Sequence, residues 1–294
     1  MTHWSKKREK LEFDLITKSS LDMILPMGEL SEFFKDLNSI QATFIDIPQN
    51  SKKILSICFA ASKTTNPFSR QMTLSLTEVA KKVQNFPDVG AVLLHGGANR
   101  SFSAGGDFKD VSALKEDQEI RSYLREIVEL YISLLKIEVP IVAAVEGFAI
   151  GQGLQIALLA DWRVASNDVH MQMPELKNGI ACPLGTLLLN AMFSRAVSLE
   201  MCMGCEKVSF EKALSFGLIQ EGFETSDVFE KALAKAKFFA TFPQTPMRMT
   251  KRMFNQKLIS ELQNHLPQSE EAHVASFLER AGHTHFEKIL GKTS

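Results

Sequence analysis

The order of apolar and polar residues along the chain predicts strands that alternate with helices. The runs 42–47 and 53–60 combine β-branched and other apolar residues, and the polar segment PQNSK between them indicates a β-hairpin. The runs VGAVLLH (89–95) and IVAAVEG (141–147) are almost wholly apolar, which is typical of strands covered on both faces. The pattern therefore predicts a sheet whose central strands are buried.

Helical periodicity, with apolar residues three or four positions apart, recurs between and after these strands. The predicted helices are 69–86, 118–137 and 152–160. Two short strands are predicted at 161–166 and 169–173, and the chain after Thr186 is predicted to be almost all helical. Strands that alternate with helices and lead into a helical tail predict an α/β core with a C-terminal helical region.

Three parts are predicted from these patterns: an N-terminal extension (1–41), a core (42–240) and a C-terminal helical region (241–294). The extension begins with a basic cluster, KKREK (6–10), and its segment GELSEFFKDL (28–37) has helical spacing. Two interpretations of the extension stay open. It is either a short helical arm packed on the body or on a neighbouring subunit, or a partly disordered leader.

Composition narrows the classes of function. The 294 residues are 45% apolar and 23% charged, and 33 basic residues face 34 acidic ones, for a net charge of −1. This balance provides no broad basic surface for nucleic acid, so an anionic ligand must meet a local cluster of cations. The chain shows neither a run of about eighteen apolar residues nor a signal-peptide pattern, so we expect a cytoplasmic protein without a membrane span.

The cysteines indicate neither a disulfide framework nor a metal site. They are Cys58, Cys182, Cys202 and Cys205. So few cysteines do not hold a secreted domain of this size together. Cys202 and Cys205 have the C-x-x-C spacing of zinc and redox sites, but no second ligand pair follows at short spacing. His283-x-His285 lies far along the chain without an acidic pair beside it. We therefore expect reduced thiols and no bound metal.

Two glycine-rich turns each follow a buried strand: FSAGGD (102–107) and GFAIGQG (147–153). Glycine lets a backbone approach a ligand closely and present its N–H groups. The second turn opens a helix, whose N-terminus favours negative charge, so one N–H from each turn would form an oxyanion hole. Tight packing of glycines between strand and helix is the alternative explanation. Neither turn fits G-x-G-x-x-G, which disfavours a dinucleotide site.

Three segments, in this order and at this spacing, resemble the crotonase (enoyl-CoA hydratase/isomerase) superfamily: SFSAGGDF (101–108), AAVEGFAIGQGLQIALLADWRVAS (143–166) and MPELKNGI (173–180). The likeness extends over about residues 42–294. Together with NPFSR (66–70), these segments are most similar to the carboxymethylproline synthases within that superfamily. The resemblance implies a spiral of ββα units with a C-terminal helical trimerisation region, assembled as a homotrimer or a dimer of trimers.

The same resemblance implies the chemistry. It implies that malonyl-CoA is decarboxylated, that the enolate adds to pyrroline-5-carboxylate or a similar imine or semialdehyde, and that the product thioester is hydrolysed. The product of such enzymes, carboxymethylproline, is a carbapenem precursor. Coenzyme A is then part of the substrate, and no separate cofactor is implied. Arg70, Arg100 and Lys63 are candidates to meet its phosphates, or they are ordinary surface cations.

Position by position, the resemblance implies that the backbone N–H groups of Gly106 and Gln152 are the oxyanion donors and that Glu175 is the catalytic carboxylate. The residues implied to contact the substrates are Ala104, Gly105, Asp107, Phe108, Tyr123, Gln155 and His273. Two positions depart from the synthase pattern. Gln152 stands where an apolar residue is usual, and Tyr123 stands in place of a tryptophan.

Gln155 occupies the place of a second glutamate in hydratases, and this difference separates the possible reactions. Adding water across a double bond suits two carboxylates, whereas an amide neither donates nor accepts a proton at neutral pH. Loss of CO₂ needs no proton acceptor, and a second carboxylate would repel the departing one. Gln155 would instead hold that carboxylate, and Glu175 would later activate water. Two alternatives stay open: an enoyl-CoA isomerase that uses Glu175 alone, and a non-catalytic acyl-thioester-binding subunit.

Overall fold

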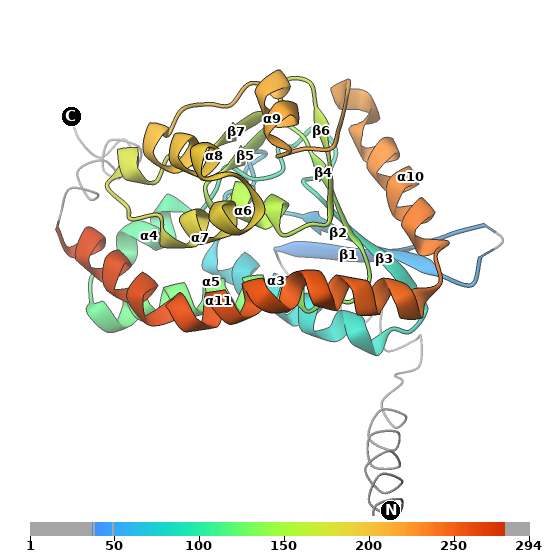
Figure 1. Ribbon diagram of the computed structural model, residues 1–294, viewed down its shortest axis with the longest axis horizontal. Helices are drawn as coiled ribbons and strands as arrows, with labels where there is room; N and C mark the ends of the chain where they lie inside the picture. Colours follow the sequence, from blue (N-terminus) through green and yellow to red (C-terminus); the bar gives the residue numbers. More distant parts are fainter. Residues whose placement is uncertain (1–36, 38, 49, 280–294) are drawn as a thin grey trace, which may run out of the picture.

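The computed structural model describes Leu37, residues 39–48 and residues 50–279 (Figure 1). The arm or leader predicted in the extension lies almost wholly outside the described residues, as do His283 and His285. Within the described ranges the chain forms a mixed sheet, a second small sheet and a set of helices. This arrangement confirms the predicted α/β class.

The larger sheet has six strands in the order β1-β2-β3-β4-β6-β8. They are β1 (Ile40–Asp46), β2 (Lys53–Phe59), β3 (Val89–His95), β4 (Ile141–Val145), β6 (Trp162–Ser166) and β8 (Glu221–Phe223). β1 and β2 form the predicted antiparallel hairpin, with Asp46 opposite Lys53. The other neighbouring pairs are parallel, so the carboxyl ends of β2, β3, β4, β6 and β8 meet at one edge of the sheet.

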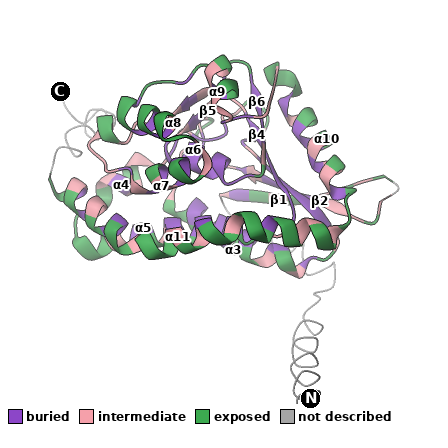
Figure 2. Ribbon diagram, in the orientation of Figure 1, coloured by how far each residue is buried: buried purple, intermediate pink, exposed green. Residues whose placement is uncertain are grey.

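Helices cover both faces of this sheet (Figure 1). The α-helices of the described ranges are α3 (Arg70–Lys82), α4 (Phe108–Ala113), α5 (Asp117–Leu135), α6 (Gln152–Leu158), α7 (Pro183–Met192), α8 (Arg195–Leu199), α9 (Phe210–Phe216), α10 (Val228–Ala240) and α11 (Gln244–Leu278). Alternation along the strands divides the core. Ile54, Leu93 and Val164 pack with α10, whereas Leu55 and Leu94 join the larger cluster with α3 and α5. Figure 2 shows buried strands between helices with exposed outer faces.

Two three-residue strands lie outside the predicted ones. β5 (Phe148–Ile150) lies within the second glycine-rich turn and pairs in parallel with β7 (His170–Gln172). β8 lies in the part that was expected to be almost all helical, and it extends the sheet beside β6, with Ala165 opposite Gly222. Three residues are too few to show a period of their own, so the neighbouring strand decides their structure.

The loops that follow β3 and β4 lie side by side because these strands are parallel neighbours. Ser103 N donates to Phe148 O at 2.7 Å, and Ile150 N donates to Ser103 O at 3.1 Å. The two glycine-rich turns are therefore joined by backbone hydrogen bonds at the carboxyl edge of the sheet, where open α/β sheets bind their ligands.

The described part of the C-terminal region is dominated by α11, a helix of 35 residues with Pro267 in its interior. α11 packs along α5, and the two helices run side by side in Figure 1. This long helix agrees with the predicted C-terminal helical region, while its part in a trimer stays a prediction. Over the described ranges, no helix has the combined length and apolar character that a membrane crossing requires.

Candidate active site

A cavity of about 320 Å³ lies beside the joined glycine-rich turns. Its wall comes from the two turns, from α5 and α6, from the segment 172–185 and from the C-terminal part of α11. Nine of the ten predicted site residues line it: Ala104, Gly105, Gly106, Phe108, Tyr123, Gln152, Gln155, Glu175 and His273. Side chains from distant parts of the chain therefore converge on one cavity, as the resemblance implied.

Asp107 is the exception among the predicted residues. Its side chain caps α4 by accepting a hydrogen bond from Lys109 N at 2.9 Å. It does not line the cavity, although its neighbours on both sides do. The structure therefore gives Asp107 a capping role at the start of α4, and its contact with a substrate stays a prediction.

The backbone around Gly106 directs its N–H away from the neighbouring strand. Phe68 N donates to Gly105 O at 2.6 Å, and Asp107 N donates to Phe68 O at 3.0 Å. Gly106 N–H itself has no acceptor among the described residues, so it is left for a ligand. Gln152 is the first residue of α6, so its N–H has no acceptor within the helix.

Gly105 and Gly151 bring the two donors together. Gly105 has a φ of +92°, and a Cβ on it would lie only 2.7 Å from Ile150 O and 3.9 Å from Gln152 N. Gly151 has a φ of +52°, and a Cβ there would lie 3.1 Å from Glu175 Oε1. Both positions thus need glycine for conformation and for space. The carboxylate of Glu175 consequently packs against the turn that presents Gln152 N–H.

A chain of hydrogen bonds holds Glu175 in place. The Tyr131 hydroxyl donates to Gln155 Oε1 at 2.7 Å, and Gln155 Nε2 donates to Glu175 Oε1 at 3.0 Å. Gln155 Nε2 also lies 3.6 Å from Met173 Sδ. The amide of Gln155 is thus occupied at both ends by the protein. These contacts make Gln155 a residue that orients Glu175, while its predicted contact with a substrate carboxylate stays a prediction.

The environment of Glu175 changes its acidity. Burial raises the pKa of its carboxyl group from 4.5 to about 7, while contacts with its own backbone, Cys182 and Gln155 act in the opposite direction. Its Oε2 is buried and has no hydrogen-bond partner among the described residues. A carboxyl group with a pKa near neutrality can both accept and deliver a proton, which suits acid–base catalysis.

His273 faces the cavity from α11 as a neutral side chain. Its Nδ1 lies 3.0 Å from Ser269 O, and its ring stacks on Phe277 with centroids 6.0 Å apart. A carbonyl only accepts hydrogen bonds, so Nδ1 carries the proton and Nε2 is an acceptor. Burial lowers the pKa of His273 to about 4, with the Ser269 carbonyl acting in the opposite direction. At neutral pH His273 therefore offers a lone pair and no positive charge.

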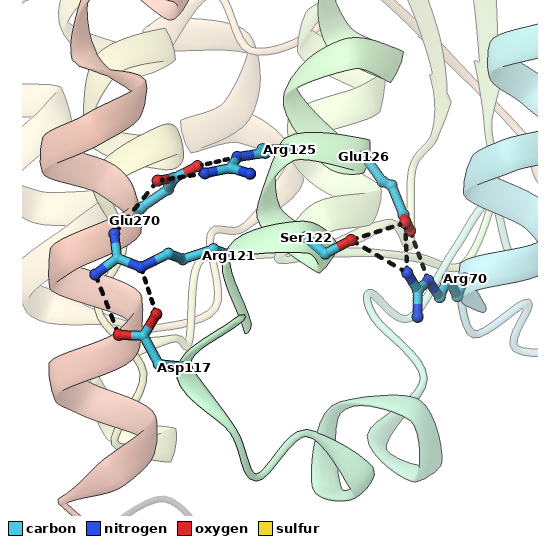
Figure 3. Close-up of polar contacts among 7 residues, drawn as sticks. All are labelled: Arg70, Asp117, Arg121, Ser122, Arg125, Glu126 and Glu270. Atoms are coloured by element: carbon cyan, nitrogen blue, oxygen red, sulfur yellow. Dashed lines mark hydrogen bonds and ion pairs between the residues drawn. The ribbon is translucent and has the colours of Figure 1, made fainter. Parts of the chain in front are cut away.

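Ion pairs hold α5 between two other helices (Figure 3). Glu270 of α11 accepts from Arg125 Nε at 2.6 Å and from Arg121 Nη1 at 3.3 Å. On the other side, Arg70 at the start of α3 pairs with Glu126 of α5 at 2.5 Å. The helices that carry Tyr123, Tyr131 and His273 are thus fixed relative to one another.

The cations considered for coenzyme A phosphates differ in their availability. Arg100 donates to Lys63 O at 2.8 Å and to Asn66 Oδ1 at 2.7 Å, so it holds the loop together from within. Arg70 is engaged by Glu126, although its side chain remains accessible to solvent. Lys63 is exposed at the surface. Lys63 is consequently the most accessible of the three.

Several cavity residues were not identified from the sequence. The apolar ones include Val111, Leu124, Ile127, Ile180, Leu184 and Phe277. Tyr131 is the most consequential, because it orients Gln155. Its helical spacing from Ile127 and Tyr123 was a signal that the three share a face of α5. That spacing does not tell which face of a helix buried on several sides meets the cavity.

Cys182 also lines the cavity, at the start of α7. A contact with the Cys202 thiol, together with burial and the neighbouring Glu175, raises the pKa of the Cys182 thiol. Cys205 donates its thiol hydrogen to Cys202 O at 3.1 Å. All four cysteines are free thiols. Among the residues that the structure describes, no three side chains of metal-ligating type gather at one place.

Comparison with known sequences finds similarity over the part of the chain that holds this cavity. The family model for enoyl-CoA hydratase/isomerase matches residues 49–288. Carboxymethylproline synthase from Pectobacterium carotovorum subsp. carotovorum is 32% identical over 244 residues, covering 83% of this chain and 98% of that protein. (E)-benzylidenesuccinyl-CoA hydratase from Thauera aromatica is 30% identical over 203 residues, covering 69% of this chain and 78% of that protein.

Solved structures agree with the predicted fold. ThnE from S. clavuligerus has a TM-score of 0.65 at 28% identity, covering 75% of this chain and 96% of its own. An enoyl-CoA hydratase/isomerase from Mycobacterium paratuberculosis has a TM-score of 0.77 at 23% identity, covering 85% of this chain and 98% of its own. The second likeness concerns the fold alone. Together they confirm a crotonase-like α/β fold.

Proposed function

The chain belongs to the enoyl-CoA hydratase/isomerase family, the crotonases, and from this premise we propose that it forms carboxymethylproline or a similar product. In the proposed reaction, malonyl-CoA loses CO₂, and the enolate adds to pyrroline-5-carboxylate or to a related imine or semialdehyde. The product thioester is then hydrolysed. Such a reaction belongs to carbapenem-type biosynthesis.

One observation carries this proposal: Gln155 is an amide whose two ends are taken by Tyr131 and Glu175. Among the described residues that line the cavity, Glu175 is therefore the single carboxylate. Hydration of a double bond is served by two carboxylates, which share water activation and proton delivery. Decarboxylation needs no base, and the absence of a second negative charge beside Glu175 favours the approach of a malonyl carboxylate.

The first step uses the backbone donors. The thioester oxygen accepts hydrogen bonds from the N–H groups of Gly106 and Gln152. When the bond between Cα and the carboxylate breaks, its electron pair remains on Cα and is shared with that oxygen as an enolate, and CO₂ leaves. Donors already in place stabilise this charge, and each contributes about 3 kcal/mol at comparable sites.

The second step forms the new carbon–carbon bond. The enolate Cα attacks the electrophilic carbon of the imine, and the electron pair of the C=N bond moves to nitrogen. The nitrogen ends as an amine once it has received a proton. The thioester carbonyl is restored at the same time, and it stays within reach of the same two N–H donors.

The third step releases the product. Glu175 removes a proton from water, and the oxygen of that water attacks the thioester carbon. The tetrahedral oxyanion is met by the N–H groups of Gly106 and Gln152. Its collapse expels the coenzyme A sulfur, which takes the proton that Glu175 removed from water, and leaves a carboxylic acid. A pKa near 7 fits Glu175 for this work, because an appreciable fraction is ionised at neutral pH.

Mass spectrometry of malonyl-CoA with the purified protein tests the proposal, with and without pyrroline-5-carboxylate. We expect a carboxymethylproline mass from the wild type. In Glu175→Gln we expect the coenzyme A thioester of carboxymethylproline to accumulate, because its hydrolysis is slowed at least about a hundredfold. Glu206→Gln is the matched control, because Glu206 forms an exposed ion pair with Lys177. Malonyl-CoA left untouched contradicts the proposal, whereas acetyl-CoA as the product retains the decarboxylation and rejects this electrophile.

An enoyl-CoA isomerase is the second candidate. A lone carboxyl group with a pKa of about 7 can move a proton between two carbons of a dienolate, and Glu175 has that character. Turnover of a 3-enoyl-CoA without any consumption of malonyl-CoA would favour this candidate. Retained acyl-CoA binding with no turnover of either substrate would favour a non-catalytic acyl-thioester-binding subunit.

A further inference from the structure

Two polar side chains reach the cavity beside the oxyanion donors without a part in the steps above. A Cβ built on Gly106 would lie 3.4 Å from the Tyr123 hydroxyl and 3.5 Å from Gln152 Oε1. Tyr123 is 6% exposed and Gln152 is 8% exposed, yet neither oxygen makes a hydrogen bond within the described residues. Both residues line the cavity, so these two oxygens are available there to a polar ligand.

The orientation of the Gln152 amide follows from Thr73. The Thr73 hydroxyl donates its single hydrogen to Ser69 O at 3.3 Å. It can therefore only accept from Gln152, whose Nε2 lies 3.5 Å away. Gln152 Oε1 is consequently the end of the amide that faces Gly106. The cavity wall thus presents a pure acceptor beside a hydroxyl that can accept as well.

The charges around this wall are mainly negative. Burial raises the pKa of Tyr123, and the carboxylates of Asp110, Asp107 and Glu126 raise it further, while Arg70 acts in the opposite direction. Figure 3 shows Arg70 engaged by Glu126, so its charge is largely balanced. A negative potential favours a cationic hydrogen-bond donor over a carboxylate at the same place.

We propose that the Tyr123 hydroxyl and Gln152 Oε1 form a subsite for the ring nitrogen of the second substrate, bound as a protonated cyclic imine. This inference rests on the proposed function and deepens it. The nitrogen donates a hydrogen bond to the wall, next to the donors that hold the enolate oxygen. A carboxylate would find no donor from Gln152 there and would meet a negative potential.

The subsite also selects the form of the electrophile. Addition of the enolate to a protonated imine joins a negative to a positive centre, and the C=N electron pair becomes the lone pair of a neutral amine. The balance needs no further proton donor. The open-chain semialdehyde presents a carbonyl oxygen at its electrophilic carbon, which could accept from the Tyr123 hydroxyl but has no hydrogen to give to Gln152 Oε1. The wall therefore favours the cyclic imine over the semialdehyde.

Binding of two unreactive probes tests the inference without turnover. L-proline and cyclopentanecarboxylate share a five-membered ring and a carboxylate, and they differ in a ring NH₂⁺ that replaces a CH₂. Their dissociation constants are measured by calorimetry with full-length protein saturated with a non-hydrolysable acetyl-CoA analogue. We expect the wild type to bind proline at least about tenfold more tightly, the scale of one charge-assisted hydrogen bond.

Substitutions at Tyr123 and Gln152 test whether these two residues cause the preference for proline. Tyr123→Phe and Gln152→Leu should each lower the ratio of the two constants to about threefold or less. Phe277→Leu, at an apolar residue of α11 that lines the cavity, should change both constants together and keep the ratio. Equal binding of the two probes by the wild type overturns the inference, as does a ratio unchanged in both folded variants. If the wild type prefers proline as expected but does not consume malonyl-CoA, the proposed function is rejected and the nitrogen subsite is kept.

Discussion

Glu175 shows how much a single residue gains from its surroundings. Most of the Glu175 side chain is out of contact with water, and its Oε2 lacks a partner among the described residues. The protonated form is therefore favoured until about pH 7, well above the ordinary range of a carboxyl group. The group that is proposed to activate water is consequently one that destabilises the fold when it ionises.

The cost of ionising buried Glu175 should appear in the pH dependence of the free energy of unfolding when the wild type is compared with Glu175→Gln. The folded-state pKa is raised from 4.5 to about 7, so the stabilising effect of the proton is complete below pH 4.5 and is lost as the pH rises through 7. A tenfold change in proton affinity corresponds to about 1.4 kcal/mol. We expect the variant to match the wild type at pH 4.5 and to exceed it at pH 8 by up to about 3 kcal/mol.

Urea denaturation at the two pH values measures this difference. Glu206→Gln removes a carboxylate from an exposed ion pair with Lys177, so it should change the free energy of unfolding by less than about 1 kcal/mol at both pH values. If Glu175→Gln were equally stable relative to the wild type at pH 4.5 and pH 8, the raised pKa would be wrong.

Gly151 is the second residue whose identity has a physical reason. In Gly151→Ala the new Cβ would meet Glu175 Oε1 at 3.1 Å with the backbone at a φ of +52°. We expect a loss of about 1–2 kcal/mol of stability and at least a tenfold slower thioester hydrolysis. Gly204→Ala is the control, because no heavy atom lies within 4 Å of its Cβ position. Similar effects of the two substitutions would contradict this account.

The long helices act as single elements, and Glu270 connects them. It lies one turn before His273, is 7% exposed, and pairs with Arg121 and Arg125 of α5. In Glu270→Gln the shape persists but two arginines lose their counter-charge. We expect a loss of about 2 kcal/mol of stability, reduced from a fully buried pair because the arginines are partly exposed. We also expect weaker binding of the second substrate, because His273 loses its anchor.

Glu261→Gln on the same helix provides the comparison. Glu261 pairs with Lys257 at 3.7 Å on an exposed face, so its loss should cost less than about 0.5 kcal/mol. Denaturation curves and the KM for the electrophile measure both variants. Equal results for the two substitutions would show that Glu270 does not position α11.

The elements also show where sequence reasoning reaches its limit. The strand 89–95 was predicted with its observed bounds, because a run buried on both faces has a clear apolar signature. β8 was missed, since Glu221–Phe223 becomes a strand through pairing with β6, more than fifty positions earlier. The two glycine-rich turns were predicted from the sequence pattern, and the resemblance assigned roles to Gly106, Gln152 and Glu175. The contact of Tyr131 with Gln155 was not, because sequence spacing shows no partner across 24 positions.

At the scale of the whole molecule, several apolar side chains of α11 are exposed on the surface. Met249, Met253 and Phe254 are 61%, 73% and 78% exposed, and Figure 2 shows the outer face of α11 largely open to solvent. Grouped apolar residues of this kind are typical of an interface between protein chains. They are consistent with the homotrimer, or dimer of trimers, that we predict.

Analytical ultracentrifugation checks this prediction. We expect the wild type to sediment with three or six times the mass of one chain. The double substitution Met253→Glu and Phe254→Glu should shift the protein towards the monomer, because two carboxylates would then be buried without partners. Leu74→Glu, at an exposed leucine of α3, should leave the sedimenting species unchanged. A monomeric wild type at micromolar concentration would contradict the prediction.

Because position 155 carries an amide, Glu175 is the one group among the described cavity residues whose pKa lies near neutrality. Burial keeps His273 unprotonated with a pKa of about 4, and the pKa values of Cys182 and the two tyrosines of the cavity are all raised. Two carboxylates in contact would titrate in two coupled steps. With Glu175 alone, the cavity behaves as a single-site buffer whose titration curve has unit slope, and a bound charge moves that curve along the pH axis without changing its shape.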